Sequence, residues 1–299
     1  MNTMKKIKNK LKLALYIIPA IFITACEEPI EDKLDSTYTR LVVDGTITTD
    51  TMAHKVLLKY SNDALNRNPI RFVSGAVVTI SDGTNTFNLH ENPKVPGEYL
   101  TDSNVYGVAG NTYTLNISNV DVDDNGVKET YTASSYLPYM SRIDTITVTD
   151  YIHNDKLRGW LINLYGQDRG GRNYYLTKAI RNDTLVTDSL KEYGAAANSG
   201  FEGEKYEGFA VYFLEKDDTT DIVRENDRIT LELNCITKDY YDFVIGFQKE
   251  YFPKNPIFSG PSANVTTNIS PKEKAVGFFA AYSVVRKSTI YKKRNKKYD

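Results

Sequence analysis

The sequence predicts a mainly β protein, in which an N-terminal immunoglobulin-like or prealbumin-like β-sandwich is followed by a second β-rich domain with one long helix. Three observations predict this fold class. Short runs rich in Val, Ile, Thr and Tyr alternate between apolar and polar residues, as half-buried strands do. Turn residues such as Ser81-Asp82-Gly83 separate these runs. A helical period of apolar residues occurs in only one stretch, late in the chain.

Residues 1–25 have the three parts of a secretory signal peptide. Lysines between Lys5 and Lys12 form a positive n-region, and Leu13 to Ile23 is an apolar run. A secretory core is about 7–15 residues long and a spanning helix needs about 20, so this run fits a cleaved signal. The following Thr24-Ala25-Cys26 resembles a bacterial lipobox, whose thiol takes a diacylglycerol before cleavage. We expect Cys26 to be the lipid-attachment residue; the alternative is an ordinary signal peptide or short anchor with a chance cysteine.

Residues 26–37 are predicted to form an acidic, lipidated tether. Glu27, Glu28, Glu31 and Asp32 crowd the start of the mature chain. Acidic residues just after the cysteine resemble the signal that sends lipoproteins of Bacteroidota to the outer leaflet of the outer membrane. We therefore expect a lipid-anchored protein that faces the cell surface. The alternative is a solvated acidic linker, which carries no information on the leaflet.

Residues 38–138 are predicted to form the sandwich domain. Its expected strands are 40–47, 55–60, 76–80, 86–90, 97–101, 112–117 and 128–134. About seven short strands at this spacing, with turns between them, are typical of immunoglobulin-like sandwiches. Pro138 marks the expected boundary with the next domain.

Residues 139–286 are predicted to form the second domain. Its expected strands are 143–148, 159–165, 173–177, 208–214, 228–236 and a closing, nearly all-apolar strand at 275–285, expected to be buried on both faces. One face of a helix over about residues 238–251 is apolar, because Tyr240, Phe243, Val244, Phe247 and Tyr251 follow the helical period. Residues 287–299 are expected to form a solvated basic tail.

Charge and cysteine content narrow the classes of function. The chain has a net charge of −1, and cleavage before Cys26 would remove five lysines and no acidic residue, which gives −6. Nucleic-acid binding needs a basic stripe, so no nucleic-acid partner is expected. Cys235 lies in an alternating strand pattern and is expected to be a small buried core residue rather than a reactive thiol.

No catalytic motif is present, so we expect the protein not to be an enzyme. His54, His90 and His153 lie far apart, and the metalloprotease, nucleophile-elbow and phosphate-loop motifs are missing. The one candidate cofactor is a structural calcium ion held by Asp121, Asp123 and Asn125, which occupy alternate positions before a glycine. The twelfth position of that loop is a threonine, and Asp-Asn-Gly is also an ordinary hairpin turn, so both interpretations stay open. The sequence identifies no ligand-binding residue.

Several stretches together resemble a known family. They are the lipobox, Leu41–Gly45, Val73–Ile80, Gly97–Tyr99, Gly110–Tyr113, Asn173–Tyr175, Ala263–Ile269 and Ala275–Val284. Their order and spacing resemble the Bacteroidota outer-membrane lipoproteins grouped as domain of unknown function 4249. The resemblance implies no established activity and no catalytic residues. It implies a surface-exposed binding or accessory subunit, often with a TonB-dependent transporter in nutrient uptake. The alternative is an adhesin or structural surface protein that binds glycans or matrix without a transporter.

Overall fold

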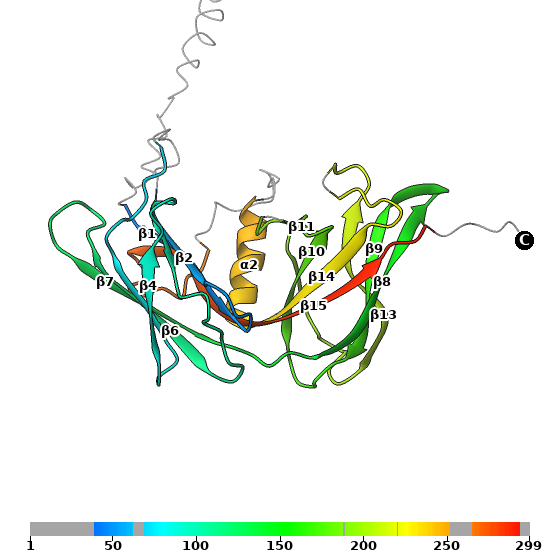
Figure 1. The fold of residues 1–299 in the computed structure, drawn as a ribbon, viewed down its shortest axis with the longest axis horizontal. Helices are drawn as coiled ribbons and strands as arrows, with labels where there is room; N and C mark the ends of the chain where they lie inside the picture. Colours follow the sequence, from blue (N-terminus) through cyan, green and yellow to red (C-terminus); the bar gives the residue numbers. More distant parts are fainter. Residues whose placement is uncertain (1–38, 62–68, 188, 220, 252–264, 294–299) are drawn as a thin grey trace, which may run out of the picture. The chain divides into compact units, whose positions relative to one another are not determined.

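The computed structural model describes residues 39–61, 69–187, 189–219, 221–251 and 265–293 (Figure 1). These belong to one compact unit, Tyr38–Asp299. The predicted signal peptide, Cys26 and the acidic tether lie outside the described residues. The described chain is mainly β with one helix, as predicted.

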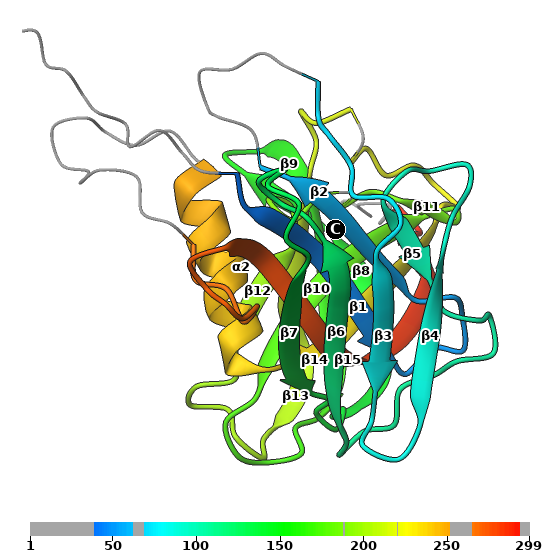
Figure 2. The ribbon, with the colours of Figure 1, turned by 90° about the vertical axis from the view of Figure 1, so that its left-hand side faces the viewer.

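The first half of the chain forms a sandwich from a sheet that folds back on itself. Its strands are β1 (Leu41–Thr48), β2 (Lys55–Tyr60), β3 (Val77–Ser81), β4 (Thr86–Glu91), β5 (Glu98–Leu100), β6 (Thr112–Val120) and β7 (Glu129–Tyr136). The short β5 pairs with both β2 and β4, so it joins the layer that holds β1 and β2 to the layer β4–β3–β6–β7. Figure 2 shows β7, β6 and β3 side by side in that second layer.

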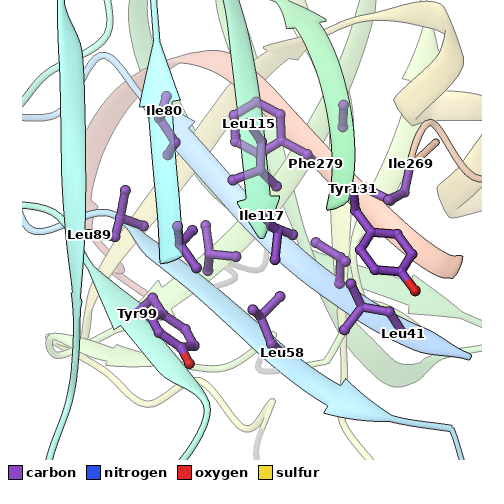
Figure 3. Packing of buried hydrophobic residues seen from close by; sticks show 14 of the residues in the cluster. Leu41, Leu58, Ile80, Leu89, Tyr99, Leu115, Ile117, Tyr131, Ile269 and Phe279 are labelled. Carbon is purple, nitrogen blue, oxygen red and sulfur yellow. The ribbon is translucent and has the colours of Figure 1, made fainter. Parts of the chain in front are cut away.

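The core of this sandwich lies between the two layers. Leu41 and Leu58 come from β1 and β2, and Ile80 and Leu115 come from the opposite layer (Figure 3). All four are wholly buried. Their positions follow the period of two that the sequence shows, because alternate residues of a strand face the same side.

The second half adds a three-stranded sheet and four further strands. They are β8 (Arg142–His153), β9 (Lys156–Gln167), β10 (Tyr174–Arg181), β11 (Thr184–Leu185), β12 (Gly194–Ala197), β13 (Lys205–Glu215) and β14 (Arg228–Ile236). The small sheet has the order β13–β9–β8. A second core joins it to β10 and β14 through Ile162 and Leu164 on one side and Leu231 and Leu233 on the other. Pro138 lies between β7 and β8.

The last strand, β15 (Ala275–Ile290), lies in the middle of the large sheet. It pairs in parallel with β1 and in antiparallel with β14. Phe279 belongs to the first core, while Val285 packs against the second. The two predicted domains therefore share this strand. Residues 287–290, expected to begin the basic tail, continue the strand and pair with β14.

The helix α2 (Lys238–Tyr251) covers one face of the large sheet (Figure 1). Tyr240 and Val244 are buried, and the Tyr240 ring lies 5.1 Å from Phe278 and 6.2 Å from Tyr282 of β15. The predicted apolar face is thus confirmed at these two positions. It is wrong at Tyr251, the last residue of the helix, which is 56% exposed.

The close approach of β1 and β15 makes a glycine necessary in β15. Gly277 has φ +94° and lies opposite Val43, and a Cβ there would overlap the Val43 carbonyl oxygen. Gly83 has nearly the same φ, +89°, with nothing near its Cβ position. We expect Gly83→Ala to cost about 1–2 kcal/mol from the left-handed backbone alone. Gly277→Ala should cost about 3 kcal/mol or more, since the overlap adds to the same strain. Urea unfolding of both variants checks this, and equal losses would contradict the close approach.

Candidate functional site

The loop predicted as a calcium site or a hairpin turn joins β6 to β7. The Asp121 carboxylate accepts hydrogen bonds from the backbone N–H groups of Asn125, at 3.1 Å, and Gly126, at 2.9 Å. The Asn125 side chain donates to Asp123 at 2.9 Å and accepts from the Val127 N–H at 2.7 Å. These bonds build a turn from the same oxygens that calcium would need. In the described part of the chain, no group of three His, Cys, Asp or Glu residues is placed to hold a metal ion.

We expect this loop to behave as a turn. Asp121→Ala should lower the free energy of unfolding by about 1–2 kcal/mol because two charge-assisted amide bonds are lost. Asp123→Ala loses one exposed contact and should cost less than about 0.5 kcal/mol. Calorimetry with calcium should give the same heats for the wild type and Asp123→Ala. A calcium heat in the wild type that disappears in the variant would establish a metal site instead.

Cys235 is a core residue, as predicted. It lies in β14 and is 1% exposed. Burial raises the pKa of the Cys235 thiol to about 12. This effect is larger than the lowering of the pKa by the positive charge of Arg169. The thiolate is the reactive form, so this side chain is inert at neutral pH.

A row of charged side chains crosses the large sheet where β10, β14 and β15 lie side by side. Lys178, Glu232 and Arg286 are directly opposite one another in register, so their side chains share one face. Lys178 Nζ lies 3.1 Å from Glu232, and the Arg286 guanidinium lies 2.7 Å from Glu232. Arg286 also donates to both carboxylate oxygens of Asp50, at 3.0 and 2.7 Å. The four side chains, which we call the charged row, therefore alternate in sign.

The charged row keeps its ionised form despite burial. Burial by itself raises the pKa of Glu232, but the charges of Lys178 and Arg286 outweigh it and hold that pKa below its ordinary value. Burial lowers the pKa of Lys178, and the combined influence of Tyr282, Tyr193 and Glu232 raises it further than burial lowers it. Lys178 and Glu232 are thus both charged at neutral pH.

The charged row lines a cavity of about 230 Å³, which we call the charged cavity. Besides the row, its wall includes Thr46 and Thr48 of β1, Tyr282 of β15, and His54, which precedes β2. The cavity lies on the face of the sheet that α2 covers further along, because Tyr282 also packs against the helix.

His54 is the one histidine in this wall, and its side chain is buried. The residue is 2% exposed, and its backbone N–H donates to Thr101 Oγ1 at 2.8 Å. Burial lowers the pKa of the ring, although backbone hydrogen bonds at Val105 and Asp50 act in the opposite direction. Its Nε2 atom has no hydrogen-bond partner among the described residues. Leaving a buried polar atom unpaired costs about 1–3 kcal/mol, so this nitrogen needs an explanation.

A second cavity, of about 200 Å³, lies between the small sheet and β10, β12 and β14. Its wall is mostly apolar, with Leu164, Val211 and Leu233 among its residues. The rings of Phe201 and Phe209 meet edge to face there, with their centroids 5.2 Å apart. We call it the apolar cavity. Its wall also includes Tyr175, Tyr206 and Asn198, whose polar groups donate hydrogen bonds to Asp168.

These polar groups converge on Asp168, which directly follows β9 and is 3% exposed. Its carboxylate accepts hydrogen bonds from the hydroxyls of Tyr206, at 2.8 Å, and Tyr175, at 3.0 Å. The side-chain amide of Asn198, at 3.2 Å, the N–H groups of Gly170 and Gly203, at 2.8 and 2.9 Å, and the Ser141 hydroxyl, at 3.4 Å, also donate to it. Burial raises the pKa of Asp168, but these donors outweigh it and hold the pKa below its ordinary value. The set ties loops together and is complete without a ligand.

Asp168→Asn should lower the free energy of unfolding at pH 7 by about 2–4 kcal/mol, because donors aimed at a carboxylate meet an amide instead. The pKa of Asp168 is lowered by folding, so its contribution is present above the ordinary aspartate range and is lost as the pH falls through the lowered value. The gap between the wild type and the variant should therefore narrow at about pH 3. Urea unfolding at both pH values tests this, with the exposed Asp217→Asn as the control. A gap that stays constant with pH would contradict it.

The residues of the charged cavity could not be predicted from the sequence. Lys178, Glu232 and Arg286 come from strands far apart in the chain, and Asp50 from a fourth place. The one local signal is that Glu232 and Asn234 replace apolar residues in a strand whose neighbours are buried. His90 and His153, the other histidines considered, lie in β4 and at the end of β8.

The fold and cavities define a β-sandwich protein with a polar cavity on the large sheet, where β1, β10, β14 and β15 lie side by side. Residues 27–288 match the family model described as Domain of unknown function (DUF4249), so the chain belongs to this family, as predicted. A search of curated proteins gives no match. Within the described ranges, no helix has the length and apolar character to cross a membrane.

Proposed function

We propose that this protein is a surface-exposed outer-membrane lipoprotein that acts as a binding or accessory subunit of a TonB-dependent transporter in nutrient uptake. The charged cavity carries the binding part of the proposal. A preorganised ligand site needs polar groups held in place by a rigid support. Lys178, Glu232 and Arg286 meet this need because three paired strands fix their positions.

The location rests on the N-terminal residues. The lysine-rich start, the apolar run and Cys26 support lipid attachment after export. The acidic residues from Glu27 to Asp32 support display on the outer leaflet. Acyl chains on Cys26 would then hold the body at the membrane.

A binding role agrees better with His54 than a catalytic one does. Backbone groups of Val105 and Asp50 raise the pKa of its ring, and its Nε2 atom is fully buried. A hydrolytic triad instead pairs the imidazole with a nucleophile and an orienting carboxylate. His54 is thus arranged as a structural residue behind the cavity wall.

We expect a TonB-dependent transporter to co-purify with the tagged protein from detergent-solubilised outer membranes. The Cys26→Ala variant should recover less of it, because the unlipidated chain no longer concentrates at the membrane. Mass spectrometry of the eluted proteins measures both. Recovery of the wild type without any transporter would favour the alternative, an adhesin or structural surface protein that binds glycans or matrix on its own.

Protease treatment of intact cells is the matched control for location. The wild-type body should be degraded while a periplasmic marker survives. A protected body would place the protein in the periplasm and remove the surface-display part of the proposal.

A further inference from the structure

The apolar cavity opens to the surface between two edge strands. Among the described strands, β12 pairs with β10 alone and β13 with β9 alone, and both contribute residues to the wall. Phe201, Phe209 and Ala196 of this wall are exposed, the two phenylalanines by 44% and 43%. A small molecule can therefore reach the wall from solvent. Exposed apolar side chains that cluster at a cavity are a feature of ligand sites, whereas single ones are ordinary.

The polar side chains of this wall are already bonded to the protein. Tyr175, Tyr206 and Asn198 donate to Asp168, as described above. The Asn198 carbonyl oxygen accepts a backbone N–H at 2.8 Å, and the Thr177 hydroxyl donates to a backbone carbonyl at 3.3 Å. None of the described wall residues carries a charge. A charged ligand would lose its hydration there without gaining a partner, so the wall selects an uncharged, apolar ligand.

Three aromatic rings form one side of the cavity. Phe209 lies between the other two, with its ring centroid 5.2 Å from Phe201 and 6.2 Å from Tyr206. All three residues belong to the wall. A ligand ring that is itself aromatic gains edge-to-face or offset contacts with such rings, in addition to the burial of its apolar surface. A saturated ring of the same size gains the burial alone, so this side of the cavity favours an aromatic ligand.

Two irregularities in β13 direct Phe209 toward the cavity. The register of β13 against β9 shifts before and after this residue, and Gly208 has φ +78° at the first shift. Between the shifts, Phe209 lies opposite Leu164, which belongs to the second core and to the cavity wall. Phe213 lies on the other face of the strand, where its ring meets Tyr151 at 5.6 Å. Bulges re-aim side chains in this way beside functional sites.

We propose that the apolar cavity binds a free, uncharged small molecule with one aromatic ring, seated against Phe201, Phe209 and Tyr206. The volume, about 200 Å³, exceeds the roughly 150 Å³ of an apolar cavity that binds benzene, which leaves room for a small substituent. The two cavities share no wall residue among those described. This site is therefore additional to the binding role proposed for the charged cavity, and it does not depend on a transporter.

The test follows the Leu and Val methyl groups by NMR while ligands are added to the purified chain from Glu27 onward, which keeps the whole compact unit. Toluene and benzyl alcohol should bind with a Kd of about 1 mM or less. Their ring currents should shift the methyl signals of Leu164, Val211 and Leu233 more than those of Leu58, which belongs to the first core. No saturable shift at about 5 mM toluene, or equal shifts in both cores, would overturn the site.

Matched ligands test the chemical class. Benzoate and benzylammonium keep the ring and add a charge, so they should bind at least about tenfold more weakly than toluene. Cyclohexylmethanol is the saturated counterpart of benzyl alcohol and should bind at least about threefold more weakly than it does. Equal affinity for either charged compound would refute the selection of uncharged ligands. Equal affinity for cyclohexylmethanol and benzyl alcohol would refute the preference for an aromatic ring.

A substitution at the mouth should block the cavity. Ala196 lies opposite Tyr175 of the wall and is exposed, so a larger side chain can enter the mouth without overpacking a core. Ala196→Leu should weaken toluene binding at least about tenfold, because the new side chain occupies the space of the ligand. A variant that binds toluene as the wild type does would refute the placement of the ligand.

A second pair of variants keeps the proposal testable if Ala196→Leu unfolds. Phe209→Ala removes a ring of the wall and should weaken toluene binding at least about threefold. Phe213→Ala is the matched control, because Phe213 lies in the same strand, is 38% exposed against 43% for Phe209, and is not a wall residue. It should leave binding unchanged. An equal effect of the two substitutions would refute the contact with Phe209.

Discussion

β1 and β15 come from opposite ends of the described chain and pair in parallel, from Leu41 opposite Ala275 to Thr48 opposite Tyr282. This pair holds the rest of the structure together. The first part of β15 closes the sandwich with Phe279, and the later part pairs with β14 beside the second core. Neither core is complete until β15, the last strand of the chain, is in place. Parallel strands such as β1 and β15 can pair only after a long connection between them. The charged cavity lies where these strands meet, so its geometry depends on the same pairing.

The charged row lies at this junction, and its position argues against a role limited to holding strands in register. The desolvation of buried ion pairs can exceed their attraction, and apolar contacts hold strands equally well. The same face shows this further along, where Leu176, Ile236 and Phe278 pack beneath α2. The charges occur instead where the face borders the charged cavity. Arg286 illustrates the difference, since it remains 41% exposed while it holds Glu232.

Much of the fold was predictable because the strands carry their own pattern. The bounds of β2 and β14 agree with the sequence prediction, and α2 begins where the apolar period begins. β12 was missed because Gly194-Ala195-Ala196-Ala197 shows neither alternation nor β-forming residues. β15 was predicted to end near Val285, since its charged and polar continuation resembles a tail until β14 is seen beside it. The charged cavity was beyond local reasoning, because β10, β14, β15 and β1 are neighbours only in the assembled sheet.

The two cavities show how differently one protein treats buried polar groups. At Asp168, four side chains and two backbone amides donate to a single carboxylate, and the surrounding loops are fixed by that arrangement. Three buried polar atoms of the described residues lack a hydrogen-bond partner, namely His54 Nε2, Trp160 Nε1 and Asn234 Oδ1, and they are spread over both sheets. His54 Nε2 is fully buried, so its missing partner concerns the packing behind the wall and not the space inside the charged cavity.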